Sequence, residues 1–297
     1  MKYKKSIVFI GILTILFLLI GCNSNDKANY YDITINKTGS GTVIKDPAQD
    51  QYEENTTVDL KAVADENWKF GFWEGSGYEA NPKNEINLVI NNNLNLNAKF
   101  GKNIFTDNFS NSSNNWYLHS YDSTIEELNY LENSIELKLK NLMKNKEGEK
   151  VTTMSIASPE NDIITTDDFL VTLEYKKVSE DGAIAIYLGD AKIEEELYVV
   201  QINSKPKEYS IYHQIVGEYP EEIEKGSSEK INSTQKNILV IKKINDELKV
   251  YINDNHLVTK SIDGTVTKSV KIENIAWPGI ELPVTNHIYN IEVLELP

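Results

Sequence analysis

The stretch Asn237-Ile-Leu-Val-Ile-Lys-Lys-Ile-Asn-Asp-Glu-Leu-Lys-Val-Tyr-Ile-Asn-Asp-Asn-His-Leu-Val-Thr-Lys260 contains three runs rich in apolar residues. Asn245-Asp246 separates the first run from the second, and Asp254-Asn255 separates the second from the third. Short connections of Asn and Asp between such runs are typical of tight hairpins. The stretch therefore predicts a meander of three antiparallel strands.

Similar strand patterns recur before and after the meander. In Phe169–Lys176 every second residue is a large apolar one, which is typical of a strand with one buried face. Further strands are expected at Ser134–Lys140, Ala183–Leu188, Leu197–Asn203, Tyr209–Ile215 and Asn286–Leu296. Ser123–Leu131 is ambiguous, because Ser123 and Glu126 could form a helix capping box while the segment could equally be a strand. The pattern predicts an all-β fold, an antiparallel β-sandwich or jelly roll.

The region before residue 101 has a different pattern. A Gly39-Ser40-Gly41 turn leads into a strand, and Thr57–Ala62 alternates as another strand. Trp68, Phe70 and Trp73 follow. A module this small depends on every large aromatic side chain that it buries, so we expect these three in its core rather than in a sugar site.

This order of features resembles the divergent internalin-type B repeat of bacterial surface proteins. The matching residues are Gly39-Ser40-Gly41-Thr42-Val43, Pro47, Tyr52, Thr57–Ala62, Trp68-x-Phe70-x-x-Trp73-x-Gly75 and Asn97-Ala98-Lys99-Phe100. The resemblance implies a small β-rich, β-grasp-like module over residues 30–101, often a spacer or adhesion unit.

Residues 102–297 resemble the concanavalin A-like, laminin-G-like jelly-roll superfamily. The resemblance rests on the opening Phe105-x-Asp107-x-Phe109 with Trp116, on the meander, and on the final strand Ile288–Val293. It implies a β-sandwich of a class that includes sugar-binding modules, adhesion domains and glycoside hydrolases. It speaks to fold more than to function.

The N-terminus carries a pattern of its own. Lys2, Lys4 and Lys5 precede an apolar run from Ile7 to Ile20, which is too short for the roughly 20 residues of a membrane-spanning helix. The run closes in Leu19-Ile20-Gly21-Cys22, which resembles the lipobox of bacterial lipoproteins. The resemblance implies a signal peptide at 1–21, a lipidated Cys22, a tether at 22–29 and a position at the cell membrane facing the exterior.

The charge of the chain limits its partners. All thirty basic residues are lysine, and the net charge is −15, or −18 once the three lysines of residues 1–21 are removed. A nucleic-acid partner is not expected, because it would require a clustered basic surface. Anchoring would fall to the lipid, because an acidic body is not attracted to anionic membranes. With Cys22 as the lone cysteine, no disulfide within the chain is expected.

We find no catalytic constellation in the sequence. Glu127-x-Asn129-x-x-Glu132 resembles the Glu-x-Asp-x-x-Glu signature of family 16 glycoside hydrolases, with asparagine at its centre. Glu132 does not share strand parity with Glu127 and lies in the expected turn before Ser134, so we interpret the match as coincidence. The four histidines are scattered, and no metal or cofactor is predicted. A structural calcium is compatible with the fold, and Asp107 would be its first candidate ligand.

Binding is the function that the sequence favours. Candidate ligand contacts are aromatic residues in loops or on an outward strand face, namely Trp116, Tyr121, Tyr212 and Trp277. The leading hypothesis is a lipid-anchored, non-catalytic protein that binds a carbohydrate or a cell-surface polymer. The alternatives are an envelope protein that binds a protein partner and no small ligand, and a glycan-active enzyme.

Overall fold

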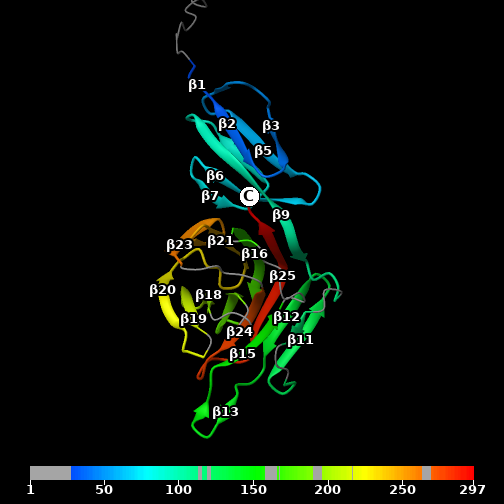
Figure 1. Cartoon of the computed structure of the whole chain (residues 1–297), viewed down its shortest axis with the longest axis vertical. Helices are drawn as coiled ribbons and strands as arrows, with labels where there is room; N and C mark the ends of the chain where they lie inside the picture. The colour runs from blue at the N-terminus through cyan, green and yellow to red at the C-terminus, as the bar shows by residue number, and fades with distance from the viewer. Residues whose placement is uncertain are drawn as a thin grey trace, which may run out of the picture.

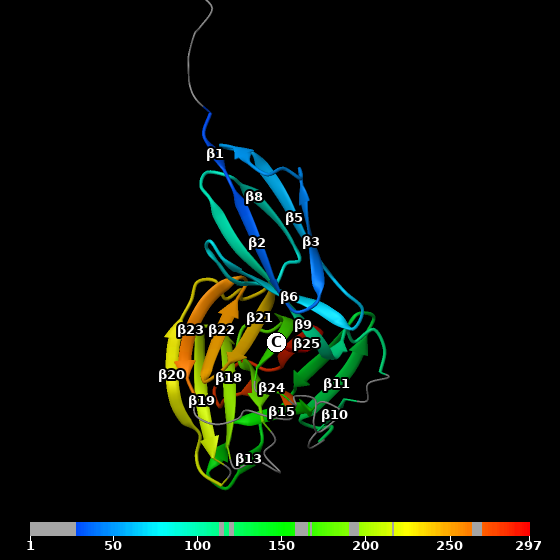
Figure 2. The same ribbon diagram turned by 45° about the horizontal axis from the view of Figure 1, so that its top comes forward.

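The computed structural model describes residues 28–112, 116–118, 122–157, 166, 168–189, 196–215, 217–262 and 269–297. The predicted signal peptide, tether up to residue 27, Cys22 and Tyr121 lie outside these residues. The described part is all β, as predicted, with a small module above a larger one in Figures 1 and 2. Among the described residues, no helix is long and apolar enough to cross a membrane.

The small module is built from the first eight strands and half of the ninth. Its three-stranded sheet has the order β3-β5-β8, while β2 runs parallel to β9 and β6 runs antiparallel to β9. Its core contains Trp73, with Phe70 and Trp68 packed against it, so the prediction that these aromatics are core residues is confirmed. The strands are β1 (Tyr30–Tyr31), β2 (Ile33–Thr38), β3 (Gly41–Asp46), β4 (Tyr52–Glu53), β5 (Thr57–Ala64), β6 (Trp68–Gly75), β7 (Tyr78–Asn81), β8 (Glu85–Val89) and β9 (Leu94–Asp107).

The large module is a sandwich of two sheets. A seven-stranded sheet, β10-β15-β24-β17-β18-β19-β20, faces the larger sheet that contains β23-β22-β21-β16-β25 with β12 and β11 beside β25. The strands are β10 (Tyr117–Leu118), β11 (Glu126–Leu131), β12 (Ser134–Leu139), β13 (Lys144–Asn145), β14 (Gly148–Glu149), β15 (Thr152–Ala157), β16 (Phe169–Lys177), β17 (Ala183–Leu188), β18 (Glu196–Ser204), β19 (Lys207–Ile215), β20 (Glu221–Ser227), β21 (Lys236–Ile244), β22 (Glu247–Ile252), β23 (Asn255–Ser261), β24 (Val270–Ala276) and β25 (Val284–Glu295).

The predicted meander is confirmed as β21, β22 and β23, which pair antiparallel in sequence order. Asn245, Asn253 and Asp254 have positive φ angles of 51°, 50° and 64°, which short polar residues tolerate better than β-branched ones. Leu239, Ile241 and Val250 point into the main core between the two sheets. The alternation read from the sequence therefore decides which side chains are buried here.

The ambiguous segment after Ser123 is a strand, so a helix with a capping box is excluded. The side chain of Asp122 accepts hydrogen bonds from the N–H and Oγ1 of Thr124, which closes a turn ahead of β11. Glu126 is the first residue of β11 and is buried, and this burial raises the pKa of its carboxyl. A buried residue in a β ladder cannot cap a helix.

The two modules share one strand. β9 pairs with β2 and β6 through Leu94–Lys102 and with β25 through Lys102–Asp107, so it runs through the predicted boundary at residues 101 and 102 (Figure 1). A Cβ added at Gly101 would lie 2.7 Å from Cβ of Leu294. Glycine is required here because the two backbones approach too closely for any side chain. The modules are joined without a linker.

Side chains also cross between the modules. Phe72 of β6 is fully buried in an apolar cluster with residues of the large module: Leu170, Val240, Tyr251, Leu294 and Leu296. The buried amine of Lys242 lies 4.1 Å from the centre of the Phe72 ring and 3.1 Å from Oε1 of Glu74. Burial lowers the pKa of Lys242, and Glu74 opposes that effect. This cluster, which we call the junction cluster, packs the small module against the large sheet.

A second buried lysine lies inside the large module. The side chain of Lys177, at the end of β16, is 1% exposed, and its amine donates a hydrogen bond to the carbonyl oxygen of Gly182. Burial lowers the pKa of Lys177 to about 7, although the nearby Asp181 carboxylate works in the opposite direction.

Lys177→Met is expected to stabilise the protein by about 1–3 kcal/mol at pH 6–7, because it removes the cost of a buried charge. The unfolded lysine keeps its proton up to about pH 10.4, whereas the folded one loses it near pH 7. The unfolded state therefore binds more protons in this window, and the parent gains stability as the pH rises. Urea unfolding at pH 6, 8 and 10 should show the advantage of the variant shrinking. An advantage that does not change with pH, or that Lys176→Met reproduces, would contradict the expectation.

Candidate functional site

One face of the seven-stranded sheet points away from the core and carries an aromatic cluster. Its floor is made of small and aliphatic side chains from three strands: Ala183, Ala185, Leu197, Val199 and Ile275. Tyr187, Tyr212 and Trp277 pack on this floor and remain partly exposed. We call this surface the outer face of the seven-stranded sheet.

The strand register places the polar side chains of this face in line. Lys271, Tyr187, Val199, Tyr212 and Glu222 occupy one row across β24, β17, β18, β19 and β20. Tyr187 and Tyr212 are two strands apart, which corresponds to about 10 Å between their backbones. The row therefore has a charged residue at each end and two tyrosine rings between them, which Val199 separates.

Glu273 is the carboxylate at the centre of this face. It is buried and accepts hydrogen bonds from Oγ of Ser155 at 2.6 Å and from Oη of Tyr187 at 2.5 Å. The amine of Lys271 lies 3.3 Å from Glu273 and 3.6 Å from the centre of the Tyr187 ring. Burial and the Glu273 carboxylate raise the pKa of Tyr187, so its hydroxyl stays a donor. Glu273 thereby holds the Tyr187 ring in a defined position.

Tyr212 is held in a similar way nearer the sheet edge. Its hydroxyl and the Ser210 hydroxyl each donate to Oε2 of Glu222 at 3.2 Å. Burial is the main cause that raises the pKa of Tyr212, and Glu222 adds to it. Glu222 itself is exposed, so its second oxygen can reach a ligand.

Asn274, the residue after Glu273, links β24 to the opposite sheet. Asn274 points inward and donates to the carbonyl oxygens of Leu137 at 3.0 Å and of Val284 at 2.9 Å. Its own side-chain oxygen accepts a hydrogen bond from Asn286 at 2.9 Å. These buried bonds tie both sheets together directly behind Glu273, which limits how far the outer face can shift.

Of the four aromatic residues predicted to contact a ligand, the three within the described residues do not all lie together. Tyr212 and Trp277 both belong to the outer face of the seven-stranded sheet. Trp116 is 5% exposed and packs between Phe105 and Phe109, while its indole N–H donates to Oδ2 of Asp107 at 2.5 Å. A ligand contact at Trp116 does not fit this burial. Tyr121 lies outside the described residues.

Asp107, the first candidate ligand for a structural calcium, has a structural role within the protein. Its Oδ1 accepts the backbone N–H of Phe109 at 2.7 Å, and Phe109 has a positive φ of 52°. With Oδ2 bonded to Trp116, both carboxylate oxygens have protein donors. Within the described part of the chain, no group of three or more His, Cys, Asp or Glu side chains is placed to hold a metal ion.

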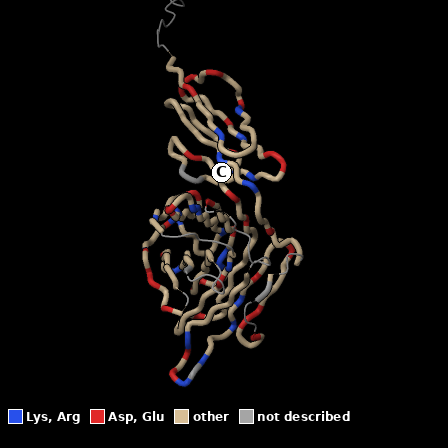
Figure 3. The backbone as a smooth tube through the Cα atoms, viewed as in Figure 1, with Lys and Arg blue, Asp and Glu red and all other residues tan. Residues whose placement is uncertain are grey.

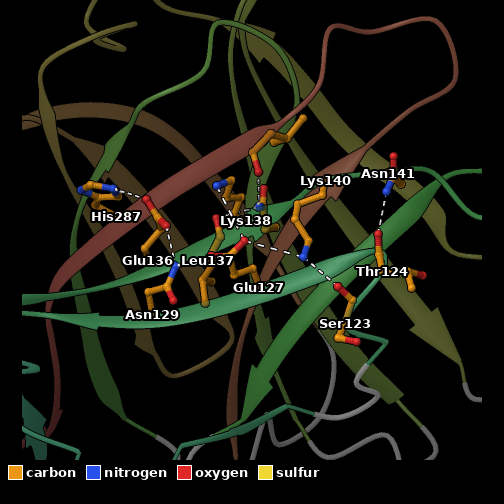
Figure 4. A network of polar contacts seen from close by, with 12 residues as sticks. Ser123, Thr124, Glu127, Asn129, Glu136, Leu137, Lys138, Lys140, Asn141 and His287 are labelled. Atoms are coloured by element: carbon orange, nitrogen blue, oxygen red, sulfur yellow. Dashed lines mark hydrogen bonds and ion pairs between the residues drawn. The ribbon is translucent and has the colours of Figure 1, made fainter.

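The motif Glu127-x-Asn129-x-x-Glu132 lies on the larger sheet (Figure 4). Glu132 is in the turn between β11 and β12, as predicted. The amide of Asn129 instead joins Glu127, at 3.0 Å, to Glu136, at 2.9 Å, and His287 lies 3.0 Å from the other Glu136 oxygen. Asn129 and then Lys138 lower the pKa of Glu127, and Asn129 and His287 lower that of Glu136 against the effect of burial.

This arrangement does not supply the chemistry of glycoside hydrolysis. A retaining enzyme requires one carboxyl group that stays protonated to act as the acid and a second that acts as nucleophile. Lowered pKa values keep both Glu127 and Glu136 ionised, and an amide occupies the space between them. The network in Figure 4 is instead a polar clamp that holds β11, β12 and β25 together.

Sequence reasoning missed Tyr187, Ser155, Lys271 and Glu273. Ser155 and Glu273 are 118 positions apart in the chain, so no local spacing shows that they meet. A signal existed in β24, where charged residues alternate with the buried Ile272 and therefore point to the other face. Such alternation shows that a side chain faces outward. Which strands lie beside it can be learned only from the folded structure.

Comparison with known proteins identifies the small module. Residues 31–104 match the family described as the divergent InlB B-repeat domain. The resemblance drawn from the sequence is thus confirmed, and we call this part the B-repeat module. A search of the curated proteins found no match to the chain.

Solved structures resemble the large module in fold. A protein of unknown function with a galectin-like fold from Bacillus subtilis superposes with a TM-score of 0.51, at 10% identity, over 66% of this chain and 97% of its own. An endo-β-1,3-glucanase from Pyrococcus furiosus also has a TM-score of 0.51, at 11% identity, over 67% and 96%. The carbohydrate-binding module CBM66 from Bacillus subtilis has a TM-score of 0.38, at 13% identity, over 52% and 92%. The first two confirm the jelly-roll class, and at these identities they show fold alone.

Proposed function

We propose that this chain is a non-catalytic glycan-binding protein, anchored to the outside of a bacterial cell by a lipid on Cys22. The observation that carries the proposal is the outer face of the seven-stranded sheet, where Tyr187, Tyr212 and Trp277 pack on one apolar floor and the buried Glu273 holds the Tyr187 hydroxyl. Aromatic rings offer apolar faces, and the carboxylate of Glu222 and the amine of Lys271 offer hydrogen bonds. Sites for small polar ligands combine these two kinds of group.

The position of Glu273 favours binding over hydrolysis. This carboxylate is 4% exposed, and Ser155, Tyr187 and Lys271 already occupy it. A nucleophile must reach the substrate carbon, and a general acid must present a proton to the leaving oxygen. Glu273 does neither in this setting, whereas it orients the Tyr187 ring well. Rigid, pre-positioned aromatic rings lower the entropy cost of binding.

The anchor follows from the lipobox at Leu19–Cys22, which lies outside the described residues. Two acyl chains on one cysteine are sufficient for stable membrane attachment. Cys22→Ala should therefore leave the chain soluble or unprocessed when cell fractions are compared. A variant that stays in the membrane at the mature mass would contradict the anchor.

The glycan proposal is tested with the chain from residue 22 onward on an array of polysaccharides and cell-wall fragments. We expect saturable binding that Tyr212→Ala and Trp277→Ala each weaken about tenfold, equivalent to about 1.4 kcal/mol. Tyr130→Ala, on an exposed aromatic residue of the larger sheet, is the matched control and should leave the affinity unchanged. The proposal would be overturned if the folded protein bound no glycan, or if neither outer-face variant changed the affinity. Release of soluble sugar would show catalysis instead.

A further inference from the structure

A hollow of about 370 Å³ lies between β2 and β3 of the B-repeat module, away from the proposed glycan site. Its lining consists of six residues: Ile33, Ile35, Lys37, Thr42, Val43 and Lys45. The two strands follow each other in the chain but belong to different sheets. Within the described residues, β2 pairs with β9 and β3 pairs with β5, so each presents its other edge to the hollow.

The register shows which backbone groups point into the hollow. The N–H of Leu94 donates to the carbonyl of Asp32, so in this parallel ladder the even residues of β2 bond β9. The N–H and C=O groups of Ile33, Ile35 and Lys37 therefore point to the opposite side. In the same way, the N–H of Asp65 donates to the carbonyl of Ser40, which shows that the backbone N–H and C=O groups of Ser40 and Thr42 point toward β5. Gly41, Val43 and Lys45 then face the hollow from β3.

One contact supports this assignment of the edges. The carbonyl oxygen of Gly41 in β3 accepts a hydrogen bond from the side-chain amine of Lys37 in β2 at 2.7 Å. A side chain therefore bonds a group that would bond a neighbouring strand if one were there. Unpaired strand edges of this kind are sites where a further strand can add.

The charge of the hollow is opposite to that of the chain. The whole chain carries −15, and Asp and Glu residues occur along both modules (Figure 3). The lining contains two lysines and no acidic residue. The Lys37 amine donates to the carbonyl oxygen of Gly41, and the Lys45 amine donates to that of Gln49 and lies 5.6 Å from the centre of the Tyr52 ring. Within the described chain, no ion pair with a carboxylate neutralises either charge. An acidic ligand would complement them.

We infer that this hollow binds an extended, acidic peptide segment of a partner protein, which adds as a strand to the free edge of β2. Backbone hydrogen bonds to Ile33, Ile35 and Lys37 would provide the register, as in other cases of strand addition. Apolar side chains of the peptide would contact Ile35 and Val43, and its carboxylates would reach Lys37 and Lys45. This inference is independent of glycan binding by the large module.

The test uses a synthetic peptide of alternating valine and glutamate with the chain from residue 22 onward. We expect saturable binding that weakens about tenfold in the double variant Lys37→Glu, Lys45→Glu and falls as salt rises. Two control peptides should bind poorly. A peptide of alternating valine and lysine lacks the negative charge. A copy of the acidic peptide with proline in place of each valine keeps the charge but lacks the N–H groups.

Amide hydrogen exchange then locates the bound peptide. Binding should slow exchange at Ile33, Ile35 and Lys37, whereas Thr34 and Asn36, which already bond β9, should change little. The inference fails if the acidic peptide does not bind the folded protein, if the lysine peptide binds equally well, or if protection appears elsewhere. A sulfated polysaccharide that competes without slowing any of these amides would also overturn it, since it would show a site for anions rather than for a strand.

Discussion

Trp116→Ala is expected to lower the free energy of unfolding by about 3–5 kcal/mol, the usual loss for a large buried aromatic side chain. The indole fills the space between Phe105 and Phe109 and donates its N–H to Asp107. Its removal leaves a cavity and a buried carboxylate with one donor fewer. Urea unfolding followed by circular dichroism measures the loss.

Two further variants separate the parts of this effect. Trp116→Phe keeps the aromatic contacts but leaves Asp107 without its indole donor, and should cost about 1–3 kcal/mol. Under conditions where Trp116→Ala is still folded, its affinity for a glycan should equal that of the parent. If Trp116→Ala instead lost less than 1 kcal/mol of stability and no longer bound the glycan, Trp116 would be a ligand contact and its core role would be contradicted.

Phe72→Ala is expected to cost about 3–5 kcal/mol and to separate the unfolding of the two modules. Phe72 is fully buried in the junction cluster, and β9 belongs to both modules. The parent chain should therefore unfold in one calorimetric transition, because neither module can unfold without exposing the shared surface. In the variant, the B-repeat module should unfold in an earlier transition of its own.

The control is Ile44→Ala, which removes a half-exposed side chain of the B-repeat module that does not belong to the junction cluster. It should change the unfolding temperature little and keep a single transition. Gly101→Ala provides an independent disruption, since its new Cβ would contact Leu294. A parent chain that already unfolds in two well-separated transitions would show that the modules are energetically independent.

The rigid junction changes how the B-repeat module is understood. Its family resemblance suggests a spacer, and spacers are usually joined to their neighbours by linkers. Here β9 and the ion pair between the buried Lys242 and the partly exposed Glu74 connect it directly to the large sheet. A peptide bound at β2 and a glycan bound at the outer face would therefore be held at a fixed relative orientation.

Local sequence patterns predicted most strands because apolar alternation and turn residues act over a few positions. The meander at β21–β23 is one case, since its turns need only the Asn and Asp residues that the sequence shows. β15, β20 and β24 are among the strands that were not predicted. In β24, Lys271 and Glu273 interrupt the apolar run, because the outer face on which they lie is partly polar.

Trp116 shows the limit of reasoning from position. It follows a polar Asn-rich segment, which favoured an exposed loop, whereas a single hydrogen bond to Asp107 and two aromatic neighbours place it in the core. Tyr212 and Trp277 were correctly placed on the surface, but nothing in the sequence indicated that they share one face. Their shared floor comes from β17 and β18, which lie between them in the sheet.

The sequence by itself determined the all-β class, the B-repeat module and the two-module order, because these depend on period, turn chemistry and local motif. Only the tertiary structure decided that Glu273 meets Ser155 and Tyr187, and that β9 belongs to both modules. These contacts join residues far apart in the chain. The free energy that selects them comes from burying whole sheet faces together, so no short stretch of sequence contains it.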